Sequence, residues 1–242
     1  KEMLEYMSGF SVYAFEEEMR QGYLTLKGGH RVGIAGKPVV KDGEVVNFHY
    51  ISGFHFRISH EVKGAGDEVL PYLYENRKLC NTLILSPPGF GKTTLLRDLI
   101  RRISDGNENG AGLNVGVVDE RSEIGGAYLG IPQNDLGMRT DLLDDCPKAQ
   151  GMYMLLRSMG PQVIAVDELG GREDTEAVLK ISRCGVRMVM TAHSADLSEL
   201  LQKKDMECLF ESHIFERLIF IKAPMGERSL FEVYDGSFGK IR

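Results

Sequence analysis

The stretch "LILSPPGFGKTTLL", residues 83–96, constrains the fold of this chain more than any other part of it. An apolar run, a Gly/Pro turn and an amphipathic run follow one another, which predicts a strand, a tight loop and a helix that opens near Lys92. The loop nearly matches G-x-x-x-x-G-K-[ST], the pattern of a phosphate-binding loop. Ser86 stands where that pattern has its first glycine. The stretch therefore predicts an α/β fold, and raises the question of whether the loop works.

The loop carries the groups that a nucleotide phosphate requires. Backbone N–H groups from Gly89 to Thr94 can form an anion-binding nest at a positive helix end, and Gly89 and Gly91 allow close approach. Lys92 would reach the β- and γ-phosphates, and the Thr93 hydroxyl would bind Mg²⁺. The prolines lack an N–H and only shape the entry to the loop. The alternative is a turn with a chance G-K-T. The candidate nucleotide-binding residues are Ser86, Pro87, Pro88, Gly89, Phe90, Gly91, Lys92, Thr93 and Thr94.

A second motif, "QVIAVDEL" at residues 162–169, is an apolar strand that ends in two acids. Asp167 would hold Mg²⁺, and Glu168 would orient or deprotonate the attacking water. We expect the strands ahead of Lys92 and Asp167 to be neighbours, with both motifs at their carboxyl ends, where parallel sheets bind ligands. The alternative is a strand that ends in a solvated acidic turn.

Two further strands also end in polar residues. "NVGVVDERSEIGG" places Asp119, Glu120 and Glu123 after a strand, and "VRMVMTAHS" places Thr191 and His193 after another. All four strand ends are expected to converge on one edge of the sheet. His193 could then sense the γ-phosphate, and one of the acids could assist Mg²⁺ or water. The alternatives are a capping or packing role for His193 and a solvated loop for the acids.

Near residue 70 the sequence pattern changes from short strands and glycine-rich turns to alternating strands and helices. This change predicts a small α+β domain over 1–70 and a P-loop domain over 71–242. In the first domain we expect a helix over 12–22, paired strands over 23–29 and 30–36, a hairpin over 38–48 and another strand over 53–59. In the second we expect strands at 81–86, 114–120, 162–168, 186–193, 213–223 and 230–235 and helices at 93–104, 148–159 and 172–184.

Composition disfavours several classes of protein. No apolar run approaches the ~18 residues of a membrane span, and the opening "KEMLEYMSGF" has neither an initiator Met nor a signal pattern, so we expect a fragment of a cytosolic protein. Four cysteines without a C-x-x-C pair disfavour a zinc site or a disulfide framework. A net charge of -6 disfavours nucleic acid as a partner.

Residues 86–101, 117–126, 139–177 and 191–194, in this order, resemble the stage III sporulation protein AA family, and residues 16–36 resemble its N-terminal region. The resemblance covers nearly the whole chain. That family is similar to the ATPases of type II and type IV secretion and of pilus motors. It implies a RecA-like P-loop core with a largely parallel sheet, preceded by a truncated α+β domain, and a serine as the family's own form of the loop.

The same resemblance implies an activity and its setting. It implies an ATPase that uses ATP and Mg²⁺, forms a homo-hexamer and lies in the cytoplasm, peripheral to the mother-cell face of the forespore membrane. Its partners would be membrane proteins of a channel that links the mother cell to the forespore.

Secretion ATPases have an acidic box and a histidine box, onto which residues of this chain fall by position. The acidic box here differs in sequence from that of the pilus motors. Its counterparts are Asp119, Glu120 and Glu123, with His193 for the histidine box. The catalytic candidates are Lys92, Glu120, Glu168 and His193. The class also uses arginines that stabilise the charge of the transition state. The candidates are Arg31 and Arg57 in the first domain and Arg121 and Arg139 in the second. The alternative for each is a surface or ion-paired arginine.

Two other functions stay open at the level of sequence. A nucleic-acid motor on a similar sheet would show DNA- or RNA-stimulated hydrolysis with a steep salt dependence. A nucleotide-gated scaffold would bind ATP with little turnover, although it would have no need of a carboxylate at Glu168. The leading hypothesis is a hexameric motor ATPase.

Overall fold

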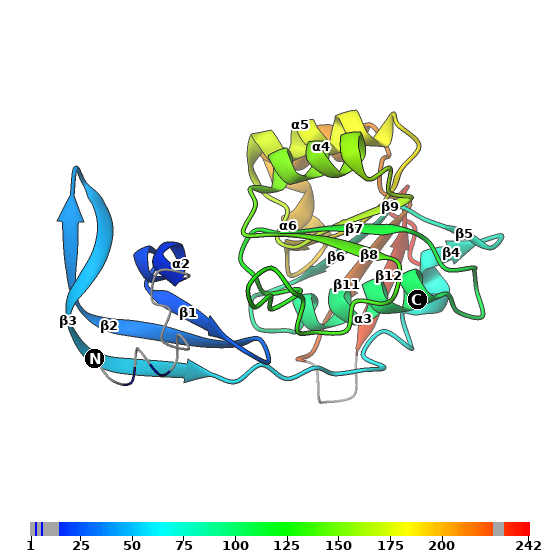
Figure 1. The fold of residues 1–242 in the computed structure, drawn as a ribbon. Helices are drawn as coiled ribbons and strands as arrows, with labels where there is room; N and C mark the ends of the chain where they lie inside the picture. The colour runs from blue at the N-terminus through cyan, green and yellow to red at the C-terminus, as the bar shows by residue number, and fades with distance from the viewer. Residues whose placement is uncertain (1–2, 4–5, 7–14, 225–229) are drawn as a thin grey trace. The chain divides into compact units, whose positions relative to one another are not determined.

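The computed structural model describes residues 3, 6, 15–224 and 230–242 (Figure 1). The chain forms two compact units, one made of residues 1–61 with 125–134 and the other of 62–124 with 135–242. Each unit has its own sheet and its own hydrophobic core. No helix in these described stretches is both long and apolar enough to cross a membrane.

The first unit is a three-stranded antiparallel sheet with one short helix. Its elements are α2 (Glu16–Arg20), β1 (Tyr23–Leu26), β2 (His30–Lys41) and β3 (Glu44–Arg57), with the strands in the order β1-β2-β3. Phe15, Met19 and Leu24 form its core, and Tyr128 from the segment 125–134 packs against them. The predicted α+β composition of this region is confirmed. Of the helix predicted over 12–22, residues 12–14 lie outside the described residues.

The hairpin predicted at Asp42-Gly43 is confirmed, because Lys41 pairs with Glu44 across that turn. The separate strand predicted over 53–59 is wrong: β3 runs unbroken from Glu44 to Arg57. Irregularities in the register between β2 and β3, one of them at Ala35/Gly36, let the pairing continue. The two strands approach so closely there that a Cβ on Gly36 would lie 2.0 Å from the Tyr50 carbonyl oxygen.

The second unit contains a seven-stranded sheet in the order β12-β11-β6-β10-β9-β7-β8. Six strands are parallel, and β12 pairs antiparallel with β11. The strands are β6 (Thr82–Ser86), β7 (Val115–Asp119), β8 (Thr140–Asp144), β9 (Val163–Val166), β10 (Arg187–His193), β11 (Arg217–Ile221) and β12 (Phe231–Asp235). A small ribbon of β4 (Tyr74–Glu75) and β5 (Lys78–Leu79) precedes them. The predicted α/β class with a largely parallel sheet is confirmed.

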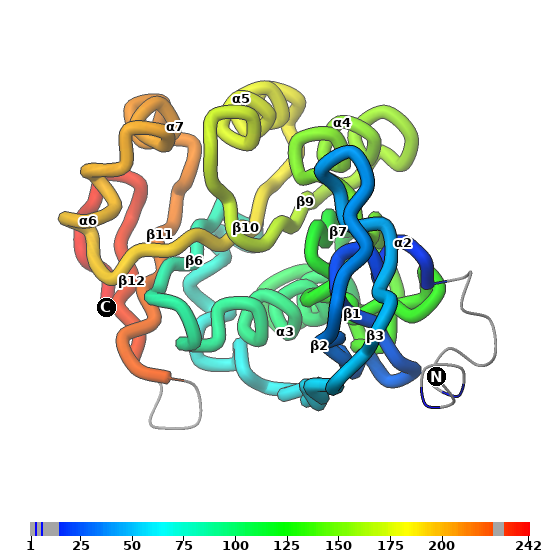
Figure 2. Tube along the Cα trace, turned by 90° about the vertical axis from the view of Figure 1, so that its left-hand side faces the viewer, coloured from blue at the N-terminus to red at the C-terminus, as the bar shows by residue number. Residues whose placement is uncertain are grey.

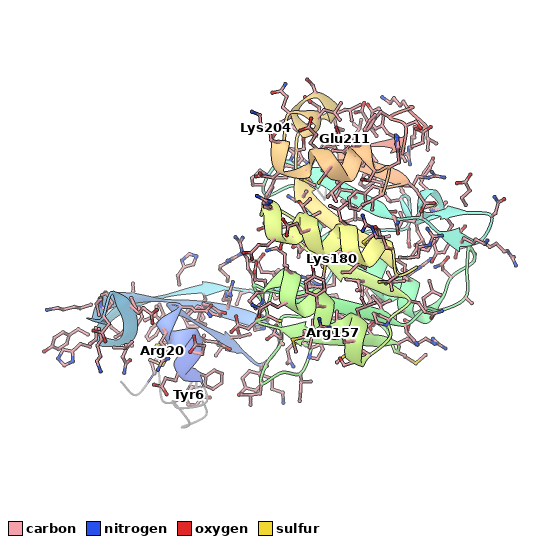
Figure 3. The ribbon with its side chains drawn as sticks, turned by 90° about the horizontal axis from the view of Figure 1, so that it is seen from above. Tyr6, Arg20, Arg157, Lys180, Lys204 and Glu211 are labelled. Atoms are coloured by element: carbon pink, nitrogen blue, oxygen red, sulfur yellow. The ribbon has the colours of Figure 1, made fainter. Side chains whose placement is uncertain are left out.

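Helices cover both faces of this sheet (Figure 2). One face carries α3 (Lys92–Asp105) and the 3-10 turn η2 (Leu70–Leu73), and the other carries α4 (Lys148–Ser158), α5 (Gly171–Ser182), α6 (Leu197–Leu201), η3 (Lys204–Met206) and α7 (Glu207–Glu211). Figure 3 shows α4 and α5 side by side, with Arg157 and Lys180 labelled on them. The Lys180 ammonium lies over the Tyr153 ring, 5.2 Å from its centroid, and joins the two helices.

Two details of the sheet differ from the sequence prediction. The strands β6 and β9, which precede the two main motifs, are not neighbours, because β10 lies between them. The short strand β8 was not predicted, because its "TDLLD" is too brief and too polar to resemble a buried strand. The inserted β10 brings Thr191 and His193 between the phosphate loop and the acids.

Candidate active site

The loop between β6 and α3 has the backbone of an anion-binding turn. Gly89 and Gly91 have φ values of +80° and +90°, which an L side chain rarely adopts. Ser86 is fully buried, and its hydroxyl donates to the Pro87 carbonyl at 2.8 Å. The positions that require glycine are thus 89 and 91, and a serine at 86 fits the entry to the turn. The helix begins at Lys92, as predicted.

The Lys92 side chain is 5% exposed and lies within the loop. Its ammonium donates to the carbonyl oxygens of Ser86 and Pro87, each at 3.4 Å, and to His193 Nδ1 at 3.0 Å. Burial lowers the pKa of Lys92, and the charges of Asp167 and Glu168 oppose that shift. All three hydrogen-bond acceptors are uncharged, so a bound phosphate would give this ammonium an anionic partner in contact.

Asp167 meets Thr93 directly after β9. The Thr93 hydroxyl donates to Asp167 Oδ2 at 2.5 Å, and the Thr191 hydroxyl donates to the other carboxylate oxygen. The register explains the second contact, because Met190 pairs with Val166 and the next residues along the two strands are Thr191 and Asp167. The structure thus brings together the two residues that the sequence analysis assigned to Mg²⁺.

These two side chains fit a bound Mg²⁺. A hydroxyl and a carboxylate are hard oxygen donors, and Mg²⁺ in nucleotide sites is held by one or two such protein groups together with phosphate oxygens. Here the two donor atoms lie within 2.5 Å of each other beside the phosphate loop. Thr93 and Asp167 are therefore the residues that would hold the ion.

Glu168 has a left-handed backbone, with φ at +54°. Its N–H donates to the Thr191 hydroxyl at 2.8 Å, and its carboxylate contacts His193 Nε2 at 3.1 Å and the Arg121 guanidinium at 2.6 Å. The side chain is partly exposed. Glu168 is therefore held at the strand end by contacts on its backbone and on both carboxylate oxygens.

His193 joins the lysine to the glutamate. An ammonium only donates and a carboxylate only accepts, so the two contacts of His193 require a neutral ring that accepts at Nδ1 and donates from Nε2. The Lys203 ammonium donates to the His193 carbonyl oxygen and fixes the backbone at the end of β10. His193 is thus part of a hydrogen-bonded chain from Lys92 to Glu168.

The acids after β7 fall into two groups. Asp119 is buried and accepts hydrogen bonds from the N–H groups of Glu123 and Ile124, so it closes the turn that follows the strand. Arg97, a buried residue of α3, donates to the carbonyl oxygens of the same two residues. The contacts of Asp119 therefore support the shape of this loop. The acids at the end of β7, in the turn after it and directly after β9 line one pocket together with two cations: Asp119, Glu120, Arg121, Glu123, Lys148, Asp167 and Glu168.

Glu120 belongs to an ion network at the start of α4. It pairs with Lys148, whose ammonium also lies 3.9 Å from Asp174 in the first turn of α5. Burial raises the pKa of Asp174, and the Gly170 N–H and the charge of Lys148 oppose that shift. Lys148 thus places a positive charge beside the pocket acids.

The four candidate arginines occupy different places. Arg121 contacts Glu168, whereas Arg139 lies at the amino-terminal end of β8 and donates to the Ser104 carbonyl at 3.1 Å. In the first unit, Arg31 and Arg57 pair across β2 and β3. Both line a cavity of that unit with Tyr23, Gly33 and His55, and Arg31 lies over the Tyr23 ring.

Sequence reasoning missed several residues of this site. It noted Thr191 as a strand-end residue but gave it no role, and it did not single out Arg97 or Lys148. Arg97 follows the loop by about one helical turn, beside the apolar residues Leu95, Leu96 and Leu99, and a charged residue so close to the phosphate loop was the signal that could have found it. Lys148 carried no comparable signal, because a lysine near a helix start is ordinary surface chemistry.

Comparison with solved structures supports the fold. The Legionella pneumophila ATPase DotB matches with a TM-score of 0.58 and 16% sequence identity over 86% of this chain, which spans 57% of the DotB chain. The pilus retraction motor PilT, solved with bound ADP, matches with a TM-score of 0.60 and 15% identity over 93% of this chain and 68% of its own. At such identities the likeness shows that the fold is shared.

Sequence comparison identifies the family. Stage III sporulation protein AA of Bacillus subtilis is 44% identical over 96% of this chain and 76% of that protein. The family described as sporulation stage III, protein AA matches residues 1–240. The chain therefore belongs to the sporulation stage III protein AA family.

Proposed function

We propose that this protein hydrolyses ATP with Mg²⁺ as a secretion-type motor ATPase. The observation that carries the proposal is the contact of 2.5 Å between Thr93 of the phosphate loop and Asp167 of the acidic strand. Two motifs from separate parts of the sequence meet there. They lie next to the buried Lys92 and to Glu168, which contacts His193. A chance G-K-T turn would not bring these groups together.

Each residue has a distinct part in the proposed reaction. Loop N–H groups and Lys92 bind the phosphates, and Thr93 and Asp167 hold the ion. Bound Mg²⁺ would neutralise the charge on the phosphate oxygens. Glu168 orients the attacking water and accepts its proton, and His193 holds the Glu168 carboxylate. As the water oxygen bonds to the γ-phosphorus, the bond from that phosphorus to the β-γ bridging oxygen breaks, which gives ADP and phosphate.

The contacts of Glu168 favour turnover that depends on a rearrangement. One carboxylate oxygen faces Arg121 and the other faces His193, so each oxygen already has one partner, and release of either contact would leave the carboxylate freer to hold the attacking water. The Arg121 side chain is 63% exposed and is the less constrained of the two. Movement of Arg121 from Glu168 toward the transferred phosphate would free the base and supply positive charge in one step.

The first prediction tests Arg121 against Arg139. Arg121→Ala is expected to lower kcat at least about tenfold, because it removes a cation from a pocket rich in carboxylates. Arg139→Ala is the matched control, since Arg139 lies just before the amino-terminal end of β8 and its guanidinium bonds to the carbonyl of Ser104 in α3. It is expected to change the thermal midpoint and leave kcat near wild type. Equal kcat values for the two variants would exclude a role for Arg121.

The proposal extends to a homo-hexamer that acts with membrane proteins of a sporulation channel, in the cytoplasm at the mother-cell face of the forespore membrane. Membership of the sporulation family and the shared fold with DotB and PilT support it. Arg31 and Arg57 are the candidates for arginines given to a neighbouring site, because both line a cavity of the first unit. They would complete a site that the phosphate-loop unit begins.

The second prediction concerns assembly. ATPase specific activity is expected to rise with protein concentration, in step with an increase in solution mass measured with and without ATP. If the active site uses an arginine from a neighbouring subunit, turnover requires that the subunits assemble. Full specific activity in a monomer would contradict the hexameric motor. Stimulation by DNA or RNA with a steep salt dependence would favour the nucleic-acid motor instead.

A further inference from the structure

Thr191 lies in β10, the strand between the phosphate-loop strand and the acidic strand. Its side chain is fully buried. It contacts three successive residues that follow β9: its hydroxyl bonds to the Asp167 carboxylate and to the Glu168 N–H, and its carbonyl accepts the Leu169 N–H at 2.7 Å. One residue therefore holds the turn that carries both acids of the proposed site.

The direction of these hydrogen bonds is fixed by their chemistry. A carboxylate only accepts hydrogen bonds, so the Thr191 hydroxyl donates its single hydrogen bond to Asp167 Oδ1. The Glu168 N–H only donates, so it uses a lone pair of the same oxygen, at 2.8 Å. With Oδ1 held in this way, Oδ2 faces the Thr93 hydroxyl. A hydroxyl satisfies both demands at once, and a methyl group satisfies neither.

The backbone at Glu168 explains why such a clamp is needed. At φ +54° this non-glycine residue lies in the left-handed region, which L side chains disfavour. The strained turn directs the Glu168 side chain toward His193 and Arg121. Strain of this kind persists only where surrounding contacts determine the conformation. The contacts of Thr191 with Asp167, Glu168 and Leu169 hold the backbone of this turn in its strained conformation.

We propose that Thr191 is a positioning residue that sets the orientation of Asp167 and Glu168 for metal binding and water activation. The inference rests on the proposed ATP hydrolysis and adds to it a residue that acts through its contacts with Asp167 and Glu168. Loss of the hydroxyl should weaken the hold on the ion and misplace the base. The phosphate loop itself should be unaffected, because Thr191 makes no contact with Gly89, Gly91 or Lys92 among the bonds of the described residues.

The test compares three variants. Thr191→Val removes the hydroxyl at nearly constant volume, and Thr191→Ser restores it. Thr82→Val is the matched control: Thr82 is also fully buried, lies in the adjacent strand β6, and its hydroxyl donates locally, to the Cys80 carbonyl at 3.0 Å. Steady-state ATP turnover, ADP affinity without metal, Mn²⁺ affinity in the presence of ADP, and the thermal midpoint are measured for each.

Thr191→Val is expected to lower kcat about tenfold to hundredfold with KM nearly constant. It should also weaken Mn²⁺ binding about tenfold and leave ADP affinity without metal unchanged. Thr191→Ser should regain most of both losses, and Thr82→Val should match wild type in both. Wild-type kcat and Mn²⁺ affinity in Thr191→Val would overturn the inference while leaving the ATPase intact. Equal losses in Thr82→Val would also overturn it, since the effect would then be structural. Absence of turnover in the wild type would instead overturn the proposed function.

Discussion

Glu168→Gln is expected to abolish steady-state ATP turnover almost completely while ATP binding is retained. The amide has the shape of the carboxylate, but it cannot accept a proton from the attacking water. General-base catalysis contributes about 10²–10⁴-fold to a rate, so a loss in that range is expected. In the proposed site the phosphates would be bound by the loop and Lys92, whose hydrogen bonds within the described part of the chain do not include Glu168, and nucleotide affinity should therefore stay near wild type.

The measurement pairs ATP turnover with direct titration of a fluorescent ATP analogue. Glu216→Gln is the control, because Glu216 is also a partly exposed glutamate that pairs with an arginine, Arg187, at 2.7 Å. Arg187 begins β10, so this pair lies at the opposite end of the strand that ends at His193. The control should keep its turnover. Undiminished turnover in Glu168→Gln would remove Glu168 from the role of base.

The sequence was sufficient to predict the loop and the acidic strand because both depend on local patterns. Gly89, Gly91 and Lys92 lie within four positions of one another, and the apolar run before Asp167 identifies a buried strand by itself. The order of the strands in the sheet, in contrast, depends on tertiary contacts and not on local patterns. Nothing local to residues 187–193 indicates that this strand inserts between the other two, so the sequence analysis wrongly expected adjacent motifs.

The same distinction applies to individual side chains. His193 could be predicted as a residue of the site, since it follows a strand, but its bonds to Lys92 and Glu168 depend on tertiary placement. Arg121 and Arg139 were equivalent candidates in the sequence, and only the fold separates a partner of Glu168 from a partner of the Ser104 carbonyl. Asp119 resembled a ligand in the sequence, yet its carboxylate accepts backbone N–H groups.

Lys92→Met is expected to have opposite effects on binding and on stability. Without the ammonium the loop lacks the positively charged side chain that would reach the β- and γ-phosphates. ATP affinity should therefore fall at least about tenfold, and turnover should be lost with it. The nucleotide-free variant, in contrast, should be no less stable than wild type. Burial lowers the pKa of Lys92, which means that the folded state disfavours its charge relative to the unfolded state. The charged lysine therefore costs stability at pH values below its folded-state pKa, and this cost is relieved as the pH rises through that pKa and the proton is lost.

The measurement is the thermal midpoint of each variant with and without ATP. In the wild type, ATP should raise the midpoint because it binds only the folded state. In Lys92→Met the midpoint should start at or above the wild-type value and respond little to ATP. Lys222→Met is the control, because the Lys222 ammonium also donates to a carbonyl, that of Ala195 at 2.9 Å, but pairs with Glu232 outside the loop. A clear loss of stability in nucleotide-free Lys92→Met would mean instead that Lys92 is a structural residue of the loop.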